Sequence, residues 1–83
     1  MTRTPCCVPF CRRTTATDKL AARGHDEWLC SVHWSAVPAR LRRLKATITR
    51  RMRRCPTEAR ARALALLWYR CKRAAIESAG GIS

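Results

Sequence analysis

The chain contains no asparagine and no glutamine, and only 5 of its 83 residues are acidic. An HNH-type nuclease needs an asparagine beside its metal, so the sequence excludes that class of enzyme. Asparagine and glutamine are also the side chains that usually recognise adenine in DNA. Without them, we expect any sequence preference for DNA to depend on guanine contacts or on DNA shape. No segment approaches about 18 consecutive apolar residues, and the sequence therefore predicts no membrane-spanning helix.

Basic residues dominate what is present. The 18 lysines and arginines give a net charge of +13 and an isoelectric point near 11.2. Such a charge attracts polyanions and is typical of nucleic-acid binding. The basic segments lack the wide apolar face of an interfacial helix, so we expect no membrane partner. The first 15 residues have no apolar run of the kind found in secretory signals, which predicts a cytoplasmic protein.

The sequence divides into two segments, which we expect to form a single compact domain: residues 1–36 and residues 37–83. A chain this short buries a small core and usually needs a metal, disulfides or regular helix packing. Residues 1–36 hold four of the six cysteines and both histidines, and they show no sustained helical or strand period. In this segment, residues 12–26 resemble a loop or hairpin that turns at Gly24.

Residues 37–79 are predicted to form two helices. Pro38 suits the first helical turn, Pro56 breaks the pattern, and Thr57 suits the N-cap of the second helix. The short break favours an antiparallel hairpin in which two apolar stripes face each other. The stripes are Leu41, Leu44, Ile48 and Met52 in the first helix, and Leu64, Leu67 or Trp68, Cys71 and Ala75 in the second.

Two short motifs in the first segment, CVPFC and CSVH, predict a metal site. They contain the pair Cys7 and Cys11 and the pair Cys30 and His33, with eighteen residues between Cys11 and Cys30. Two close pairs of sulfur and nitrogen ligands are what a tetrahedral structural zinc site requires. The alternative is that these cysteines are small buried apolar residues, as we expect for Cys55 and Cys71.

The predicted cofactor is one structural Zn²⁺ ion, and we expect residues 1–36 to be disordered without it. The choice of ligands is left open at one position, because Cys6 adjoins Cys7 and His25 lies near Cys30. The expected fold is mainly α, with an N-terminal zinc knuckle or treble-clef-like segment packed on the antiparallel two-helix hairpin.

Catalysis has little support in the sequence. Four protein ligands would close the metal shell, whereas a catalytic zinc keeps an open position. Asp26 and Glu27 are the acids beside the ligands, and we interpret both as solvated loop residues. We therefore expect a protein that is not an enzyme and has no catalytic residues.

The first predicted helix carries eight basic residues within fifteen positions and no acid. Like charges at this density repel each other unless an anion is close, which favours a nucleic-acid-binding surface. Trp68 and Tyr69 could stack on single-stranded bases, but their place in an apolar run favours the core. The predicted nucleic-acid-binding residues are Arg40, Arg42, Arg43, Lys45, Arg50, Arg51, Arg53 and Arg54.

The sequence CVPFC…CSVHWSAVPARLRRL resembles small, mostly uncharacterised zinc-finger-like proteins encoded by bacteriophages and prophages. The resemblance covers residues 7–44 well and the second helix loosely. It implies metal ligation by Cys7, Cys11, Cys30 and His33. It also implies that Trp34 packs beneath the site and that Pro38 opens the basic helix.

These observations together predict a zinc-stabilised, strongly basic nucleic-acid-binding protein, with DNA expected in preference to RNA. By the resemblance, it would be a phage or prophage regulator or accessory factor in the cytoplasm of a bacterial host. One alternative is an interaction module that binds and inhibits an acidic host protein, such as a polymerase, a nuclease or a defence factor. A second alternative is a virion or assembly component whose charge neutralises packaged DNA. The oligomeric state is left open.

Overall fold

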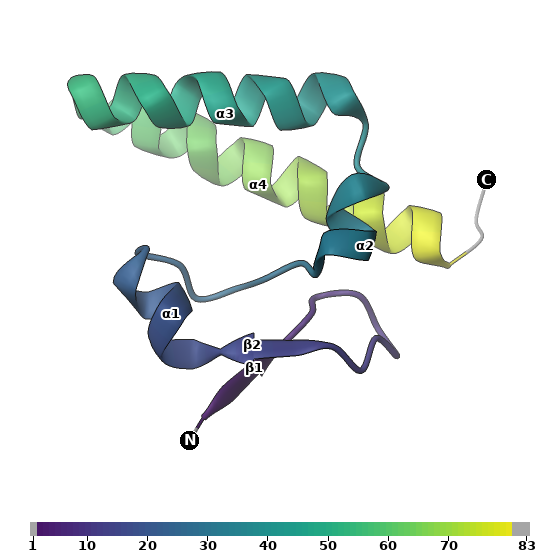
Figure 1. The fold of residues 1–83 in the computed structure, drawn as a ribbon. Coiled ribbons are helices and arrows are strands. Elements are labelled where there is room, and N and C mark those ends of the chain that lie inside the picture. The colour runs from purple at the N-terminus through teal and green to yellow at the C-terminus, as the bar shows by residue number, and fades with distance from the viewer. Residues whose placement is uncertain (1, 81–83) are drawn as a thin grey trace.

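Two long helices form the C-terminal part of the molecule (Figure 1). The computed structural model describes residues 2–80. Residue 1 of the first predicted segment and residues 81–83 of the second lie outside this range. Helix α3 spans Ala39–Arg54 and helix α4 spans Glu58–Ala79. The two helices run antiparallel, as the sequence predicted.

Local chemistry sets the ends of these helices. Pro38 is the residue at the N-terminal boundary of α3. Cys55 precedes Pro56 and has an extended backbone with φ −146°, which ends α3. The hydroxyl oxygen of Thr57 accepts a 3.1 Å hydrogen bond from the backbone N–H of Arg60, so Thr57 caps α4. The predicted break and cap are both confirmed.

Helix α4 carries the buried side of the hairpin. Leu67, Cys71 and Ala75 are buried, and the last two are 0% exposed. None of the residues 39–54 of α3 is fully buried, and Leu44 is 45% exposed. The stripe predicted for α3 is therefore only partly covered, because α4 contacts both α3 and the N-terminal part of the chain, whereas α3 packs mainly on α4.

Two expectations about this hairpin are wrong. Cys55 is exposed, because it lies beyond the last turn of α3 and so leaves the apolar stripe. Tyr69 is 50% exposed and does not belong to the core. It stands two positions after buried Leu67, which turns it about 200° around the helix. Cys71 and Trp68 do pack in or against the core, as predicted.

The N-terminal segment contains short elements that hydrophobic periodicity does not detect. Strands β1 (Arg3–Pro5) and β2 (Thr14–Ala16) pair antiparallel, with Thr4 opposite Thr15. Helix α1 (Thr17–Ala22) follows, and the chain turns at Gly24, where φ is +76°. Helix α2 (Ser31–Ser35) then leads into α3. The predicted loop or hairpin over residues 12–26 thus consists of β2, α1 and a glycine turn.

The main core lies where the N-terminal segment meets α4. Half-buried aromatic residues, including Trp28, Trp34 and Trp68, pack around it. Figure 1 shows α2 against the C-terminal half of α4. The mainly helical fold, with a cysteine-rich segment packed on a two-helix hairpin, is therefore as predicted. The buried residues of this core are Cys6, Val8, Leu29, Cys30, Val37, Cys71 and Ala75.

The described part of the chain has a flat shape, which extends 37 Å in two directions and 16 Å in the third. Across residues 2–80, every helix is too short or too polar to cross a membrane.

Candidate metal centre

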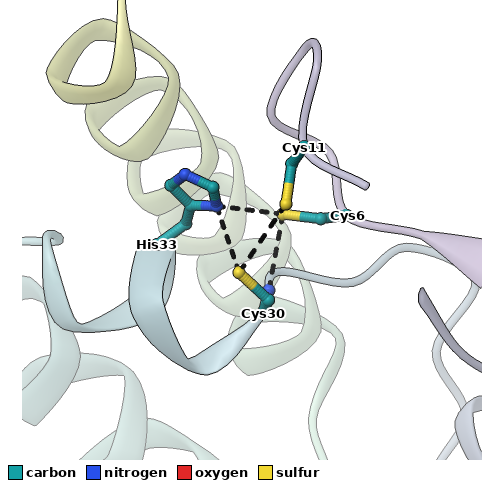
Figure 2. A group of neighbouring side chains, drawn as sticks. All are labelled: Cys6, Cys11, Cys30 and His33. Carbon is teal, nitrogen blue, oxygen red and sulfur yellow. Dashed lines mark hydrogen bonds between the residues drawn. The ribbon is translucent and has the colours of Figure 1, made fainter. Parts of the chain in front are cut away.

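Three cysteines and one histidine meet at the junction of the N-terminal segment and the hairpin (Figure 2). Cys6 follows β1, Cys11 precedes β2, Cys30 is the N-cap of α2, and His33 lies within α2. Their ligand atoms all lie within 4.8 Å of one another. Cys6 and Cys30 are buried, while Cys11 and His33 are half-buried. The four side chains could therefore hold one metal ion.

Three of the distances among these atoms are close to those around a tetrahedral ion. An ion about 2.3 Å from sulfur and about 2.0 Å from nitrogen separates two sulfurs by about 3.8 Å and a sulfur from a nitrogen by about 3.5 Å. The Sγ atoms of Cys11 and Cys30 are 3.9 Å apart. The Nδ1 atom of His33 lies 3.5 Å from Sγ of Cys6 and 3.1 Å from Sγ of Cys30. Little movement is needed to seat an ion between them.

Backbone hydrogen bonds fix the conformation of residues 6–11, which we call the first ligand loop. The N–H of Cys6 donates to the carbonyl of Arg13 at 3.0 Å, and the N–H of Cys11 donates to the carbonyl of Val8 at 3.2 Å. The N–H of Cys30 points at Sγ of Cys6, at 3.4 Å. Val8 is 4% exposed and anchors the loop in the core. The loop is thus tied to β2 and to the second ligand pair.

The predicted ligand set needs one correction, because the structure places Cys6 in the group and Cys7 outside it. The thiol of Cys7 faces Oε2 of Glu27 at 3.8 Å, and its backbone N–H donates to the carbonyl of Trp28 at 2.8 Å. The two adjacent side chains thus lie in different surroundings, with Cys6 facing His33 and Cys7 facing Glu27. Of the alternatives left open, Cys6 fits and the exposed His25 does not.

The thiols of Cys7 and Cys30 differ in acidity. Burial raises the pKa of the Cys7 thiol, although the backbone of Trp28 opposes the shift. Burial also raises the pKa of Cys30, but hydrogen bonds from the backbone and side chain of His33, and from Cys11 and Cys6, lower it to about 7. About half of Cys30 is therefore ionised at neutral pH to the thiolate, which is the form that binds metal.

Glu27 links the ligand segment to α4, a role that the sequence interpretation missed. Its Oε1 accepts a 2.9 Å hydrogen bond from the indole Nε1 of Trp68, and its Oε2 accepts a 2.8 Å bond from Nζ of Lys72. The bond from Lys72, and to a smaller extent the bond from Trp68, holds the pKa of the Glu27 carboxyl below its usual value. Glu27 is therefore not a solvated loop acid, whereas Asp26 is exposed as expected. No periodicity could have revealed this contact between distant segments.

The predicted basic residues lie along α3, and two of them have contacts within the protein. Nε of Arg42 donates to the carbonyl of Val37 at 3.0 Å, and Nζ of Lys45 lies 5.8 Å from the ring centre of Trp34. The other six are exposed: Arg40, Arg43, Arg50, Arg51, Arg53 and Arg54. In the described range, residues 2–80, the three ion pairs involve α4 residues and Glu27 but no residue of α3.

Comparison with known proteins provides no assignment: no family model, no curated protein and no solved structure matches this chain.

Proposed function

We propose that the protein binds one structural Zn²⁺ ion and uses the basic surface of α3 to bind nucleic acid, with DNA favoured over RNA. The donor set supports the choice of zinc, since three thiolates and one imidazole in tetrahedral positions suit Zn²⁺. Four protein ligands would leave no open position for a substrate, so the ion would stabilise the fold and would not catalyse a reaction. Binding of the ion would join the β1–β2 loop to α2.

The observation that carries the nucleic-acid proposal is an arginine face on α3, interrupted by Ala46 and Thr47 between Arg43 and Arg50. At 100° per residue, the six exposed arginines fall within an arc of about 160°, opposite the stripe of Leu41 and Ile48. The face runs from Arg40 to Arg54, a length of about 21 Å at 1.5 Å per residue. Thr47 and the last four arginines of this face also line a shallow hollow. Such a surface matches the repeating negative charge of a nucleic-acid backbone.

Salt dependence tests this proposal. We expect a labelled duplex to bind the zinc-loaded protein at low salt, with affinity falling by about 0.9 log unit per phosphate contact for each tenfold increase in salt. Binding would be followed by fluorescence anisotropy. Absence of binding at low salt, or affinity that does not change with salt, would refute the proposal.

A pair of charge variants locates the surface. The double variant Arg50→Gln with Arg54→Gln should weaken binding. It should also make the slope of log affinity against log salt shallower, by the amount expected for the loss of about two phosphate contacts. Arg62→Gln with Arg73→Gln is the matched control, because it removes two exposed arginines of α4, which pair with Glu58 and Glu77. Equal losses in the two proteins would show that net charge matters and that α3 does not.

The proposed biological setting, a phage or prophage regulator or accessory factor, rests on the sequence resemblance. Pull-down from a bacterial lysate with and without nuclease treatment distinguishes it from the host-protein inhibitor. Partners that persist after digestion favour the inhibitor, and their loss favours nucleic-acid binding. Presence of the protein in purified particles would instead indicate a virion component.

A further inference from the structure

Phe10 is held fully exposed at the tip of the first ligand loop. The side chain is 101% exposed, and it is the single phenylalanine of the chain. Its backbone has φ +69°, and within residues 2–80 it is the non-glycine residue with a positive φ. A bulky residue in this conformation is unfavourable, and such strain is concentrated at functional sites. An exposed aromatic residue in such a position requires an explanation beyond packing.

The loop holds Phe10 outward through its neighbours. Cys11 follows it directly and belongs to the metal-ligand group, as does Cys6 at the other end of the loop. The N–H of Cys11 donates to the carbonyl of Val8, which closes the turn that contains Phe10. The position of Phe10 is therefore set by the same contacts that set the ligands. Figure 1 shows this loop, between β1 and β2, projecting at the edge of the molecule.

Three exposed arginines accompany Phe10, and no acidic residue precedes Asp18 in the sequence. Arg12 and Arg13 follow the loop directly. Arg3 lies across the hairpin, where its guanidinium donates to Oγ1 of Thr14 at 3.0 Å and to the carbonyl of Thr14 at 3.1 Å. These contacts fix Arg3 beside the start of β2. The loop and hairpin thus present positive charge together with an aromatic ring.

A shallow hollow next to the hairpin adds two further aromatic residues. Arg13 and Thr14 line one part of it, and Trp28, Ser31 and Trp34 line another. Both tryptophans are half-buried, and each lines the hollow and also packs against the core. Arginine beside aromatic rings is the combination that binds single strands, because phosphates pair with the charge and unpaired bases stack on the rings.

We infer that the β1–β2 loop is a second nucleic-acid contact, which binds unpaired nucleotides by stacking a base on Phe10 while Arg12 and Arg13 hold the adjacent phosphates. This inference rests on the proposed function and extends it to a substrate class, nucleic acid with a single-stranded part. Paired bases stack on each other within a duplex, so the Phe10 contact requires an unpaired base. The arginine face of α3 contacts backbone phosphates and has no such requirement.

The test compares a labelled single strand of about ten nucleotides with the duplex of the same sequence, using the full-length zinc-loaded protein. We expect Phe10→Ala to weaken single-strand binding by about fivefold or more, and to change duplex binding by less than about twofold. Phe10→Trp should retain single-strand affinity, because it keeps a stacking ring. Phe10→Leu should lose it, because leucine is apolar but does not stack.

Val32→Ala is the matched control, since Val32 is an apolar residue 51% exposed on α2, outside the loop. Zinc content by native mass spectrometry shows that each variant keeps its fold. Unchanged single-strand affinity in Phe10→Ala, or full affinity in Phe10→Leu, overturns the inference; the second result indicates an apolar contact, such as a protein partner. If Phe10→Ala leaves single-strand affinity unchanged while the α3 variants weaken duplex binding, the proposed function stands and the loop inference fails. If wild type binds neither probe, both fail.

Discussion

The indole of Trp68 on α4 donates a 2.9 Å hydrogen bond to the carboxylate of Glu27, which lies 41 residues earlier in the chain. Lys72, one turn further along α4, binds the second oxygen of the same carboxylate at 2.8 Å. Glu27 itself stands three residues before the ligand Cys30. A single side chain therefore attaches the segment that carries the second ligand pair to the helical hairpin.

Replacing Glu27 should loosen this attachment. We expect Glu27→Ala to lower the free energy of unfolding by about 1–2 kcal/mol, because it removes a charged hydrogen bond to Trp68 and an ion pair that solvent partly screens. Glu77→Ala is the control, because Glu77 forms an exposed pair with Arg73 and its loss should have a much smaller effect. Urea titration of the zinc-loaded proteins measures both, and equal costs would contradict a special role for Glu27.

The pH dependence of stability should carry the signature of Glu27. Its pKa is lowered by Lys72 and Trp68, so its contribution is present above the unfolded-state pKa of about 4.3 and is lost as pH falls through the lower folded-state value. The difference in stability between wild type and Glu27→Gln should therefore be constant from about pH 6 to 9 and shrink below about pH 4. Protonation of the metal ligands affects both proteins and cancels in the difference.

The same ion pair predicts behaviour at high pH. Glu27 raises the pKa of Lys72, so the contribution of Lys72 is complete below its unfolded-state value of about 10.4 and disappears only as pH rises through the folded-state value. Urea titrations of the two proteins at a series of pH values measure both limits. A difference that varies steadily between about pH 6 and 9 would contradict this assignment.

The choice between adjacent cysteines can be tested directly. Cys6→Ser should weaken zinc affinity by more than about 100-fold, which exceeds the usual effect of losing an outer-shell partner. Cys7→Ser should retain one zinc per chain, because the Cys7 thiol faces Glu27 and not the ligand group. Native mass spectrometry with a competing chelator measures both. Retention of zinc by Cys6→Ser together with its loss from Cys7→Ser would restore the ligand set predicted from the sequence.

The two cysteines outside the ligand loops should also respond differently to the same substitution. Cys71 is 0% exposed within the core, and burial raises the pKa of its thiol. Cys71→Ser should lower the free energy of unfolding by about 1–3 kcal/mol, because it buries a hydroxyl in an apolar site. Cys55 is exposed in the link that joins α3 to α4. Cys55→Ser should therefore change the free energy of unfolding by less than about 0.5 kcal/mol. Similar effects in a urea titration would contradict the assigned burial.

The helical hairpin was predictable because its signals are local. Apolar residues recur at three- and four-residue steps, and Pro56 and Thr57 mark the break between the helices. The structure places α3 and α4 on either side of that break. A cluster of cysteines and His33 that could hold a metal ion was predictable in the same way, since two close pairs of candidate ligands are visible in the sequence.

The remaining features depend on the direction in which side chains point after folding. Cys6 and Cys7 are chemically identical neighbours, and only the contacts of the folded chain, such as the hydrogen bonds of their backbone N–H groups to Arg13 and Trp28, turn Cys6 toward His33. Glu27 resembles any loop acid until α4 places Trp68 and Lys72 beside it. The sequence alone therefore determined the two long helices, the basic surface and a set of cysteine and histidine residues able to hold a metal, because these depend on short-range spacing and charge. Only the tertiary structure decided that Cys6 joins this set and that Glu27 binds α4, because these depend on contacts between distant segments. It also decided the exposure of Phe10, which depends on the turn from Val8 to Cys11.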